Sequence, residues 1–362
     1  MKIFCVIGTR PEAIKMAPVI LKLRETHEVF VVSTGQHKTM LDQTLIGFNI
    51  IPDLNFNLMK ENQTILDILS KSVEKLSELI IEKNPDLILG QGDTTTALAA
   101  ALAGYYNKVP FGHVEAGLRS FDFENPWPEE MNRVLISKLA AIHFCPTESA
   151  KENLKNEGIV NNVYVTGNTV IDSLLKLAIK RENTSTKQIL ITMHRRENFG
   201  ENSENILNAI LKIVKNNNDV SVVFPVHLNP NIRKKVFSIL NHERIKLVDP
   251  LDYKEFVEAM SKSYIILTDS GGVQEEAPAL GIPVLVLRET TERPEAVKYG
   301  VAKLVGSDEN NIIIETEKLI NNVEEYKKMS KGISPYGDGN SSQRILDILN
   351  YQTIETLIKL KK

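Results

Sequence analysis

The stretch Thr268–Tyr299 contains side chains whose types and spacing suggest chemistry most directly. An apolar run, Tyr264–Thr268, predicts a buried strand. A serine and two glycines follow it closely as Ser270, Gly271 and Gly272, and a helical pattern comes next. Glycines at a helix start let backbone N–H groups converge on an anion. We therefore interpret this serine–glycine turn as a phosphate site.

Charged side chains follow the glycines. The helical pattern opens at Val273, which places Glu275 and Glu276 in the first turn of the predicted helix, and Arg293 lies farther along the stretch. A carboxylate suits sugar hydroxyls, and a guanidinium suits phosphate. The alternative is an ordinary strand–helix turn that Ser270 caps, with Glu276 as an acid that the helix dipole favours.

Polar and ionisable residues also follow the other apolar runs. Ligands of open parallel sheets bind outside the carboxyl ends of the strands, so these residues are candidates for a site. They are Gly8–Glu12, Thr34–His37, Gly90–Thr96 and His113–Ser120 in the first half, and His194–Asn198, His227 and Asp249–Leu251 in the second. Two such edges facing each other would form an interdomain cleft.

Three of these candidates, and also Glu129 in the first half of the chain, have to be weighed against a structural explanation. Asp93 precedes a helix and is also a suitable N-cap. Glu115 lies on a glycine-flanked loop where a capping role is harder to explain, so function is favoured. Glu129 comes at a helix start, where acids are favoured in any case. His194 is followed by two arginines directly after a buried strand, which favours a cationic site for phosphate or carboxylate.

The sequence lacks the motifs of several common enzyme classes and cofactor sites. There is no G-x-G-x-x-G after the first strand and no G-x-x-x-x-G-K-[ST]. There is no H-E-x-x-H, no zinc-type Cys/His set and no G-x-S-x-G elbow. No D-x-D pair, the usual metal handle in sugar transfer, lies among the candidates. We infer that the protein uses neither a metal nor a nicotinamide cofactor.

Short apolar runs alternate with helical patterns along the chain, which is typical of doubly wound α/β domains with parallel sheets. The predicted strands are Lys2–Ile7, Glu28–Ser33, Asp86–Leu89, Val109–Val114, Ala141–Cys145, Val163–Thr166, Gln188–Met193, Val220–Pro225, Ile245–Val248, Tyr264–Thr268, Pro283–Leu287 and Ala302–Val305. Predicted helices include Pro11–Arg24, Lys38–Gly47, Thr64–Lys83, Thr94–Tyr105, Pro128–Leu139, Val170–Lys180 and Ser341–Leu360. We predict two Rossmann-like domains with a boundary near Thr166–Asn168.

Composition supports a globular protein of two domains. The 362 residues exceed one ordinary core, and the net charge of -3 does not indicate binding to nucleic acid or an anionic membrane. The longest apolar helical run, Ala97–Tyr106, is too short to span a bilayer, and the N-terminus does not resemble a signal peptide. Cys5 and Cys145 lie in strand-like runs, as expected for buried thiols in a reducing compartment. We predict a cytoplasmic protein.

Long motifs run in order from residue 8 to about residue 300. They are Gly8–Glu12, Gln91–Thr94, His113–Arg119, Pro126–Arg133, His194–Asn198 and Thr268–Glu295. Together they resemble the non-hydrolysing UDP-N-acetylglucosamine 2-epimerase family. The resemblance implies a glycosyltransferase B-type fold, with residues 1–167 as the first domain and residues 168–344 as the UDP-binding domain. It also implies that the C-terminal helix, about residues 345–362, packs back onto the first domain.

The resemblance further implies reversible epimerisation at C2 of UDP-N-acetylglucosamine to UDP-N-acetylmannosamine. UDP leaves C1, loss of the C2 proton gives 2-acetamidoglucal, and reprotonation from the other face with return of UDP gives the epimer. The implied catalytic residues are Asp93, Glu115, Glu129 and His194. The residues implied to bind substrate or UDP are Arg10, Lys15, Leu251, Phe256, Ser270, Gly271, Gly272, Glu276 and Arg293.

Individual roles also come from the resemblance. Arg10, Lys15 and His194 are implied to meet the sugar diphosphate, and the serine–glycine turn to hold it at the helix start. Glu276 is implied to bind the ribose hydroxyls. Arg293 is implied to stabilise the diphosphate or to join in domain closure. The uracil pocket is implied to include Leu251 and Phe256.

A second substrate site, used for activation, is implied beside the first. Its residues are Gln36, His37, Arg195 and His227. Thr39 and Asn62 replace a glutamine and an arginine of the family, so activation by substrate is left open. The implied partners are the two UDP-sugars, UDP and a second copy of the chain. A hydrolysing 2-epimerase, a glycosyltransferase of the same fold and an inactive nucleotide-sugar sensor are the alternatives.

Overall fold

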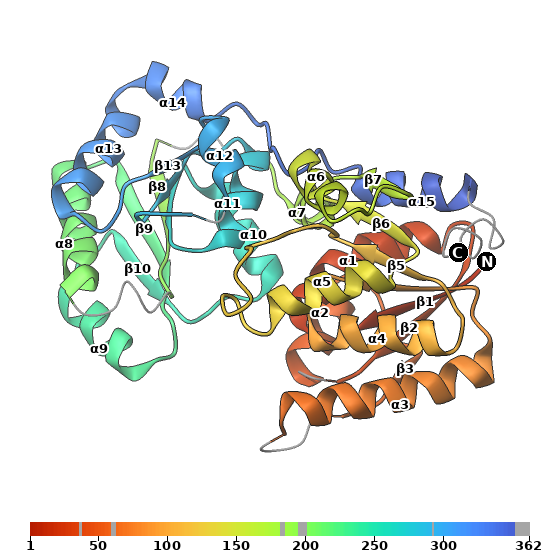
Figure 1. Ribbon diagram of the computed structural model, residues 1–362. Coiled ribbons are helices and arrows are strands. Elements are labelled where there is room, and N and C mark those ends of the chain that lie inside the picture. Colours follow the sequence, from red (N-terminus) through yellow and green to blue (C-terminus); the bar gives the residue numbers. More distant parts are fainter. Residues whose placement is uncertain (36–37, 59–62, 182–184, 195–200, 292, 352–362) are drawn as a thin grey trace. The chain divides into compact units, whose positions relative to one another are not determined.

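The computed structural model describes residues 1–35, 38–58, 63–181, 185–194, 201–291 and 293–351, which form two compact units (Figure 1). The first unit comprises Met1–Ser173 and the segment that begins at Tyr336, and the second comprises Leu174–Pro335. Each unit is built on its own parallel sheet with helices packed against it. The predicted α/β class with two parallel sheets is therefore confirmed.

The sheet of the first unit has seven strands within the described residues, in the order β3-β2-β1-β4-β5-β6-β7. They are β1 (Lys2–Ile7), β2 (Glu28–Ser33), β3 (Leu54–Asn55), β4 (Leu87–Gln91), β5 (Phe111–Val114), β6 (Ile142–Cys145) and β7 (Val163–Val165). Six of them were predicted as apolar runs, whereas β3 was not. The chain reverses its order between β1 and β4, and ligands of such sheets bind at this switch point.

Helices cover both faces of the first sheet (Figure 1). They are α1 (Arg10–Leu23), α2 (Lys38–Gly47), α3 (Ile65–Lys83), α4 (Thr95–Tyr106), α5 (Glu129–Leu139), α6 (Glu148–Asn156), α7 (Thr169–Leu177) and α15 (Ser341–Tyr351). On one face α4 contacts both α3 and α5, and Phe4 and Val6 of β1 belong to the core beneath them. The helix α1 contacts α2 and α15.

The last described helix, α15, belongs to the first unit although it follows the whole second unit in the chain. It contacts α1, and Asp172 Oδ1 accepts bonds from the Ser342 amide at 2.7 Å and from its hydroxyl at 2.6 Å. The predicted packing of the C-terminal helix on the first domain is confirmed. The predicted end of this helix at Leu360 lies outside the described residues.

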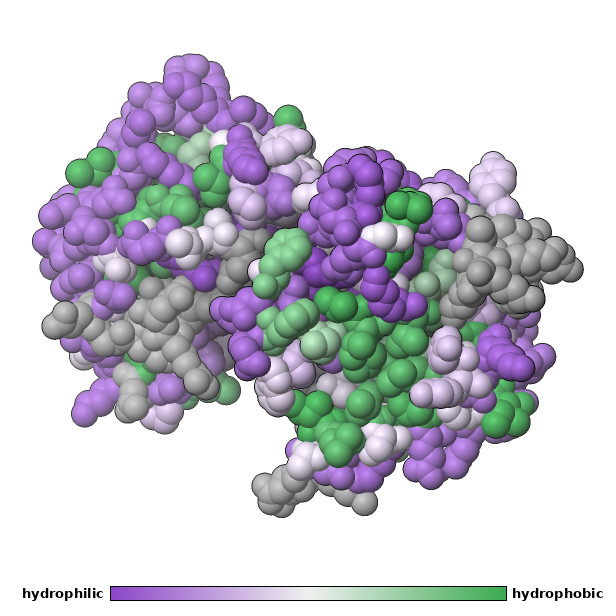
Figure 2. Space-filling view, in the orientation of Figure 1, coloured by the Kyte–Doolittle hydropathy of each residue, from purple (hydrophilic) through white to green (hydrophobic). Residues whose placement is uncertain are grey.

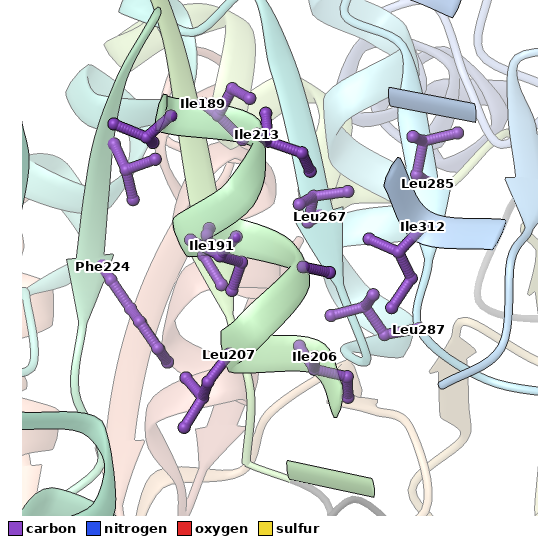
Figure 3. Packing of buried hydrophobic residues seen from close by; sticks show 14 of the residues in the cluster. Ile189, Ile191, Ile206, Leu207, Ile213, Phe224, Leu267, Leu285, Leu287 and Ile312 are labelled. Carbon is purple, nitrogen blue, oxygen red and sulfur yellow. The ribbon is translucent and has the colours of Figure 1, made fainter. Parts of the chain in front are cut away.

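The sheet of the second unit has six strands within the described residues, in the order β10-β9-β8-β11-β12-β13. They are β8 (Lys187–Thr192), β9 (Val220–Pro225), β10 (Ile245–Val248), β11 (Ile265–Thr268), β12 (Val284–Val286) and β13 (Ala302–Leu304). The helices are α8 (Glu201–Asn216), α9 (Pro230–Ile239), α10 (Tyr253–Lys262), α11 (Gly271–Glu276), the 3₁₀-helix η2 (Ala277–Leu280), α12 (Pro294–Lys298), α13 (Glu309–Asn321) and α14 (Val323–Met329). Figure 3 shows Ile191, Leu267 and Leu285 of the sheet packed against Leu207 of α8 and Ile312 of α13.

Both cysteines lie in strands, buried and unpaired, as the apolar runs predicted. Burial raises the pKa of Cys5 and that of Cys145 to about 12, so both stay thiols at neutral pH. Within the described part of the chain, none of the helices combines the length and apolar content that crossing a bilayer requires.

Candidate active site

Two of the predicted carboxylates follow neighbouring strands of the first sheet. Gln91 at the end of β4 pairs in register with Val114 at the end of β5. Asp93 follows the first of these strands and Glu115 follows the second. Both carboxylates thus leave the carboxyl edge of the sheet, next to the switch point between β1 and β4.

The carboxylate of Glu115 is held by a cation and an amide. Lys15 Nζ of α1 lies 2.5 Å from Glu115 Oε2, and Gln91 Nε2 donates to the same oxygen at 2.8 Å. The Glu115 side chain is only 7% exposed, and its backbone is left-handed with φ of 65°. A nearly buried carboxylate with a partnered charge and a fixed backbone is suited to accept a proton at a defined position.

The loop after Glu115 is fixed by two further residues. Gly117 has φ of 87°, and a Cβ there would lie 2.2 Å from the Ala150 carbonyl oxygen, so no side chain fits. The Arg119 side chain is 1% exposed and pairs with Glu157 at 2.6 Å. The loop that follows Glu115 is therefore held against α6 and its C-cap residue Glu157.

Asp93 is held by α5. Its Oδ2 accepts bonds from Arg133 Nε at 2.8 Å and lies 2.6 Å from Arg133 Nη2, and Asn132 Nδ2 donates to the Asp93 carbonyl at 2.9 Å. The alternative that Asp93 caps α4 is wrong, because Thr94 is the N-cap and accepts from the Ala97 amide at 3.0 Å. The Asp93 carboxylate pairs with a guanidinium instead.

Glu12 ties the loop that carries Asp93 to the start of α1. Its carboxylate accepts from the Gly8 amide at 3.0 Å, the Thr9 amide at 2.7 Å and the Thr94 hydroxyl at 2.7 Å. Burial raises the pKa of Glu12 to about 7 although these bonds favour the ionised form. The loops after β1 and β4 consequently share one anchor.

His113 of β5 fixes the same loop from the other side. Its Nε2 lies 2.7 Å from the Gly92 carbonyl oxygen, which only accepts, so the proton sits on Nε2. Burial lowers the pKa of His113 to about 4, so the ring is neutral at physiological pH. We assign His113 a role in holding the backbone next to Asp93.

The two acids at the start of α5 differ in their contacts. Glu130 accepts from the Phe121 amide at 3.0 Å and from Arg133 at 2.9 Å. Burial opposes its ionisation, but these bonds outweigh burial and hold the pKa of Glu130 below its usual range. Glu129 begins the helix, and its side chain makes no hydrogen bond or ion pair with another described residue. Of the pair, only Glu129 is thus left for a ligand.

The predicted phosphate ligands of the first unit lie on α1. Arg10 begins the helix and is partly exposed, and its side chain makes no hydrogen bond or ion pair with the described residues. Lys15, by contrast, lies against Glu115. Contact of either residue with a diphosphate stays a prediction.

In the second unit, His194 follows β8 and lies beside Asp269, which follows β11. His194 Nδ1 is 3.0 Å from Asp269 Oδ1, and Asp269 is fully buried. The strands β8 and β11 are neighbours, and Thr192 pairs in register with Thr268. The sequence pattern did not predict this pairing of an imidazole with a carboxylate.

The predicted turn after β11 forms, but its helix begins earlier than expected. α11 starts at Gly271 rather than Val273, so the prediction that Glu275 and Glu276 lie in its first turn is wrong: they are its last two residues. Ser270 occupies the N-cap position without a side-chain capping bond, so the alternative of a turn capped by its hydroxyl is also wrong. Binding of phosphate by Ser270, Gly271 and Gly272 stays a prediction.

Glu276 and Arg293 both have partners within the second unit. Glu276 is 6% exposed, and its Oε1 accepts from the Tyr253 hydroxyl at 2.8 Å. Arg293 Nε forms an ion pair with Glu275 Oε1, and the Arg293 amide donates to the Thr291 hydroxyl at 3.0 Å. The guanidinium is therefore oriented by Glu275.

The remaining predicted residues are less defined by contacts. Leu251 lies in the loop before α10 and Phe256 within that helix, and both are partly buried. His227 is exposed and its Nδ1 accepts from the Asn229 amide at 3.2 Å. The other residues predicted for the second substrate site, Gln36, His37 and Arg195, lie outside the described residues. In the described part of the chain, no three His, Cys, Asp or Glu side chains are grouped as metal ligands would be.

The sequence pattern missed several residues that hold the predicted ones. Asn132 and Arg133 were part of a recognised motif. Their spacing of three and four residues from Glu129 indicates one face of a helix. No pattern in the neighbouring sequence, however, indicates that Asp93 is their partner. Tyr253 carries no signal at all, since a tyrosine in a helix is ordinarily a core residue.

The family model described as UDP-N-acetylglucosamine 2-epimerase matches residues 21–350. The chain belongs to this family. As a member of the UDP-N-acetylglucosamine 2-epimerase family it is an isomerase, and the predicted family and enzyme class are confirmed.

Close relatives span almost the whole chain. A UDP-N-acetylglucosamine 2-epimerase of Campylobacter jejuni is 50% identical over 371 residues, covering 96% of this chain and 97% of the relative. The crystal structure of the Neisseria meningitidis enzyme bound to UDP-GlcNAc is 49% identical, with a TM-score of 0.86, and covers 97% and 100% of the two chains. That of the Methanocaldococcus jannaschii enzyme with UDP-GlcNAc and UDP is 36% identical, with a TM-score of 0.77 and the same coverage.

Proposed function

We propose that this chain interconverts UDP-N-acetylglucosamine and UDP-N-acetylmannosamine by eliminating UDP and adding it back through 2-acetamidoglucal. The observation that supports the mechanism is the pair of carboxylates at neighbouring strand ends, each beside a cation: Glu115 with Lys15, and Asp93 with Arg133. Inversion at C2 removes a proton from one face of the sugar and returns one to the other. It therefore requires more than one acid–base group.

The steps balance without a redox cofactor. The C1–O bond breaks and its electron pair leaves with the β-phosphate oxygen of UDP. A carboxylate takes the C2 proton, and the C2–H electron pair becomes the C1=C2 double bond of the glucal. In the second half of the reaction a second acid protonates C2 from the opposite face, the C1=C2 electron pair forms the new C2–H bond, and the UDP oxygen bonds to C1.

The proposal divides the work between the two units. Asp93, Glu115 and Glu129 of the first unit move protons, and Arg10 and Lys15 meet the diphosphate. In the second unit the proposed nucleotide ligands are His194, Leu251, Phe256, Ser270, Gly271, Gly272, Glu276 and Arg293. Donors that face the departing diphosphate stabilise the charge that grows there as the C1–O bond breaks.

Incubation with UDP-N-acetylglucosamine in heavy water tests the proposal. Because the C2 proton exchanges with a carboxyl group that equilibrates with solvent, deuterium is expected at C2 of both epimers, detected by proton NMR and mass spectrometry. Substrate incubated without protein should keep its C2 proton. Turnover with no deuterium at C2 would exclude a route through the glucal.

The same incubation separates the alternative activities. An epimerase of the proposed kind yields intact UDP-N-acetylmannosamine, and its equilibrium mixture is reached from either epimer. A hydrolysing epimerase instead yields free N-acetylmannosamine and UDP. A nucleotide-sugar sensor yields neither product.

We also propose that the chain forms a homodimer through the outer face of α4 and α5. Figure 2 shows hydrophobic residues gathered over these helices, and the exposed side chains there include Tyr106 and Leu135. Burial of such a patch is a common source of association.

Sedimentation velocity should show twice the mass of one chain. Leu135→Glu should shift it to the monomer, whereas Val160→Glu, at another exposed apolar position of the same unit, should not.

The cytoplasmic location, the independence from a cofactor and the second substrate site stay predictions. Of the four residues proposed for the second site, only His227 lies among the described ones.

A further inference from the structure

We propose that Asp269 is a positioning residue for His194, and that it fixes the orientation and tautomer of the imidazole so that Nε2 is presented to the substrate. The proposal rests on the proposed function, which assigns His194 to the sugar diphosphate. It assigns a role to Asp269, which lies between the predicted strand and the serine–glycine turn.

The geometry joins one carboxylate to two groups of a single residue. The His194 amide donates to Asp269 Oδ1 at 3.2 Å and to Oδ2 at 3.0 Å, and His194 Nδ1 lies 3.0 Å from Oδ1. The strands that precede His194 and Asp269 are also joined: the hydroxyl of Thr192 in β8 lies 2.5 Å from the hydroxyl of Thr268 in β11. Backbone and ring of His194 are therefore held by the same buried group.

Elementary chemistry then selects the tautomer. An ionised carboxylate only accepts hydrogen bonds, so Nδ1 carries a proton where it faces Asp269. The other nitrogen, Nε2, lies on the far side of the ring. The His194 side chain is 45% exposed, whereas the Asp269 side chain is 0% exposed. A ligand therefore reaches the imidazole on the side away from the carboxylate.

If Asp269 held only the backbone of the loop, the enzyme would tolerate Asp269→Asn. One acceptor oxygen satisfies the His194 amide, and an asparagine supplies one. In the structure each carboxylate oxygen of Asp269 faces a donor: Oδ2 lies 3.0 Å from the His194 amide, and Oδ1 lies 3.0 Å from Nδ1. Asp269→Asn offers one acceptor and one donor, so the ring must turn away or change tautomer. The substitution keeps the size of the side chain and removes the property that the proposal invokes.

Kinetics of single and double variants test whether Asp269 acts through His194. Asp269→Asn should lower kcat by about 10–10⁴-fold, a range that spans the loss of a group orienting a metal-bound histidine and the loss of the orienting aspartate in a serine-protease triad. In a His194→Asn background, the same substitution should lower kcat by less than about threefold further, because the ring it orients is gone. If the double variant instead lost kcat by the product of the two single-variant factors, the proposal would be wrong. Asp308→Asn, at the exposed N-cap of α13, is the matched control and should leave kcat unchanged.

Nitrogen-15 NMR of the imidazole rings tests the tautomer without substrate. Spectra are recorded above about pH 8, where an ordinary imidazole is neutral. In the wild type, His194, assigned by its loss in His194→Asn, should carry its proton on Nδ1, and Asp269→Asn should reduce that population. His113 should keep its proton on Nε2 in both proteins. A wild-type His194 with its proton on Nε2 alone would overturn the positioning role, whatever reaction the enzyme catalyses.

Discussion

Replacing Glu115 with glutamine is expected to lower kcat of the epimerase by about 10²–10⁴-fold, the usual contribution of a positioned acid–base group. The affinity for UDP should change by less than about threefold, or under ~1 kcal/mol. The amide keeps the size of the side chain and can still accept from Lys15 and Gln91, which hold Oε2 at 2.5 and 2.8 Å. It cannot take a proton from C2.

The measurement combines three readouts on the same protein. Initial rates from each epimer give kcat, heavy water reports exchange at C2, and titration calorimetry with UDP gives affinity. Exchange should fall in parallel with kcat, since both need the same proton transfer. A variant that turns over normally but has lost UDP affinity would place Glu115 in binding rather than in proton transfer.

A matched control separates loss of this carboxylate from loss of any carboxylate. Glu152 lies on α6 of the same unit with its side chain 55% exposed, and pairs only at the surface with Lys155. Surface pairs contribute little to stability. Glu152→Gln should therefore keep kcat, UDP affinity and melting temperature. Equal losses in both variants would indicate damage to the unit as a whole.

The positions of most strands along the chain were predictable because strands covered on both faces need apolar side chains throughout. β11 shows this: its four residues, Ile265–Thr268, are all buried, and the apolar run predicted them. β3 was missed because Leu54–Asn55 has two partly buried residues at the edge of the sheet and no apolar run. An edge strand this short depends on its neighbour rather than on its own sequence.

The start of α11 was predicted two residues late for a related reason. The helical pattern was read from apolar periodicity, and glycines add nothing to such a pattern. Gly271 and Gly272 were consequently assigned to a loop, although glycine also adopts helical backbone angles. The sequence pattern correctly predicted that Glu276 follows β11, but it predicted the wrong position for Glu276 within the helix.

The site itself was predictable only as a set of strand ends. Asp93 and Glu115 were recognised because each follows an apolar run. Their partners come from other elements: Lys15 is 100 residues before Glu115, and Arg133 is 40 residues after Asp93. Such pairings arise from the packing of helices on the sheet, which no local pattern encodes. The resemblance supplied roles for the carboxylates but not the contacts that hold them.

Replacing Glu276 with glutamine should weaken UDP binding by about 10–100-fold, because a hydrogen bond to a charged group contributes about 1.5–3 kcal/mol. Glu276 is 6% exposed, and Tyr253 donates to its Oε1 at 2.8 Å. Under the proposed function the carboxylate also accepts from the ribose hydroxyls. Proton exchange at C2, measured at saturating substrate, should be affected far less than affinity, in contrast to Glu115→Gln.

Calorimetry with UDP and 2′-deoxy-UDP tests whether the lost affinity belongs to the ribose. The wild type should bind the deoxy analogue more weakly, since a buried acceptor then loses its donor. Glu276→Gln should discriminate between the two ligands much less. Tyr253→Phe keeps the carboxylate and removes only the internal donor, so it should keep the preference for the ribose hydroxyl. If Tyr253→Phe erased that preference and Glu276→Gln kept it, the hydroxyl would be recognised by Tyr253, and the role proposed for Glu276 would be wrong.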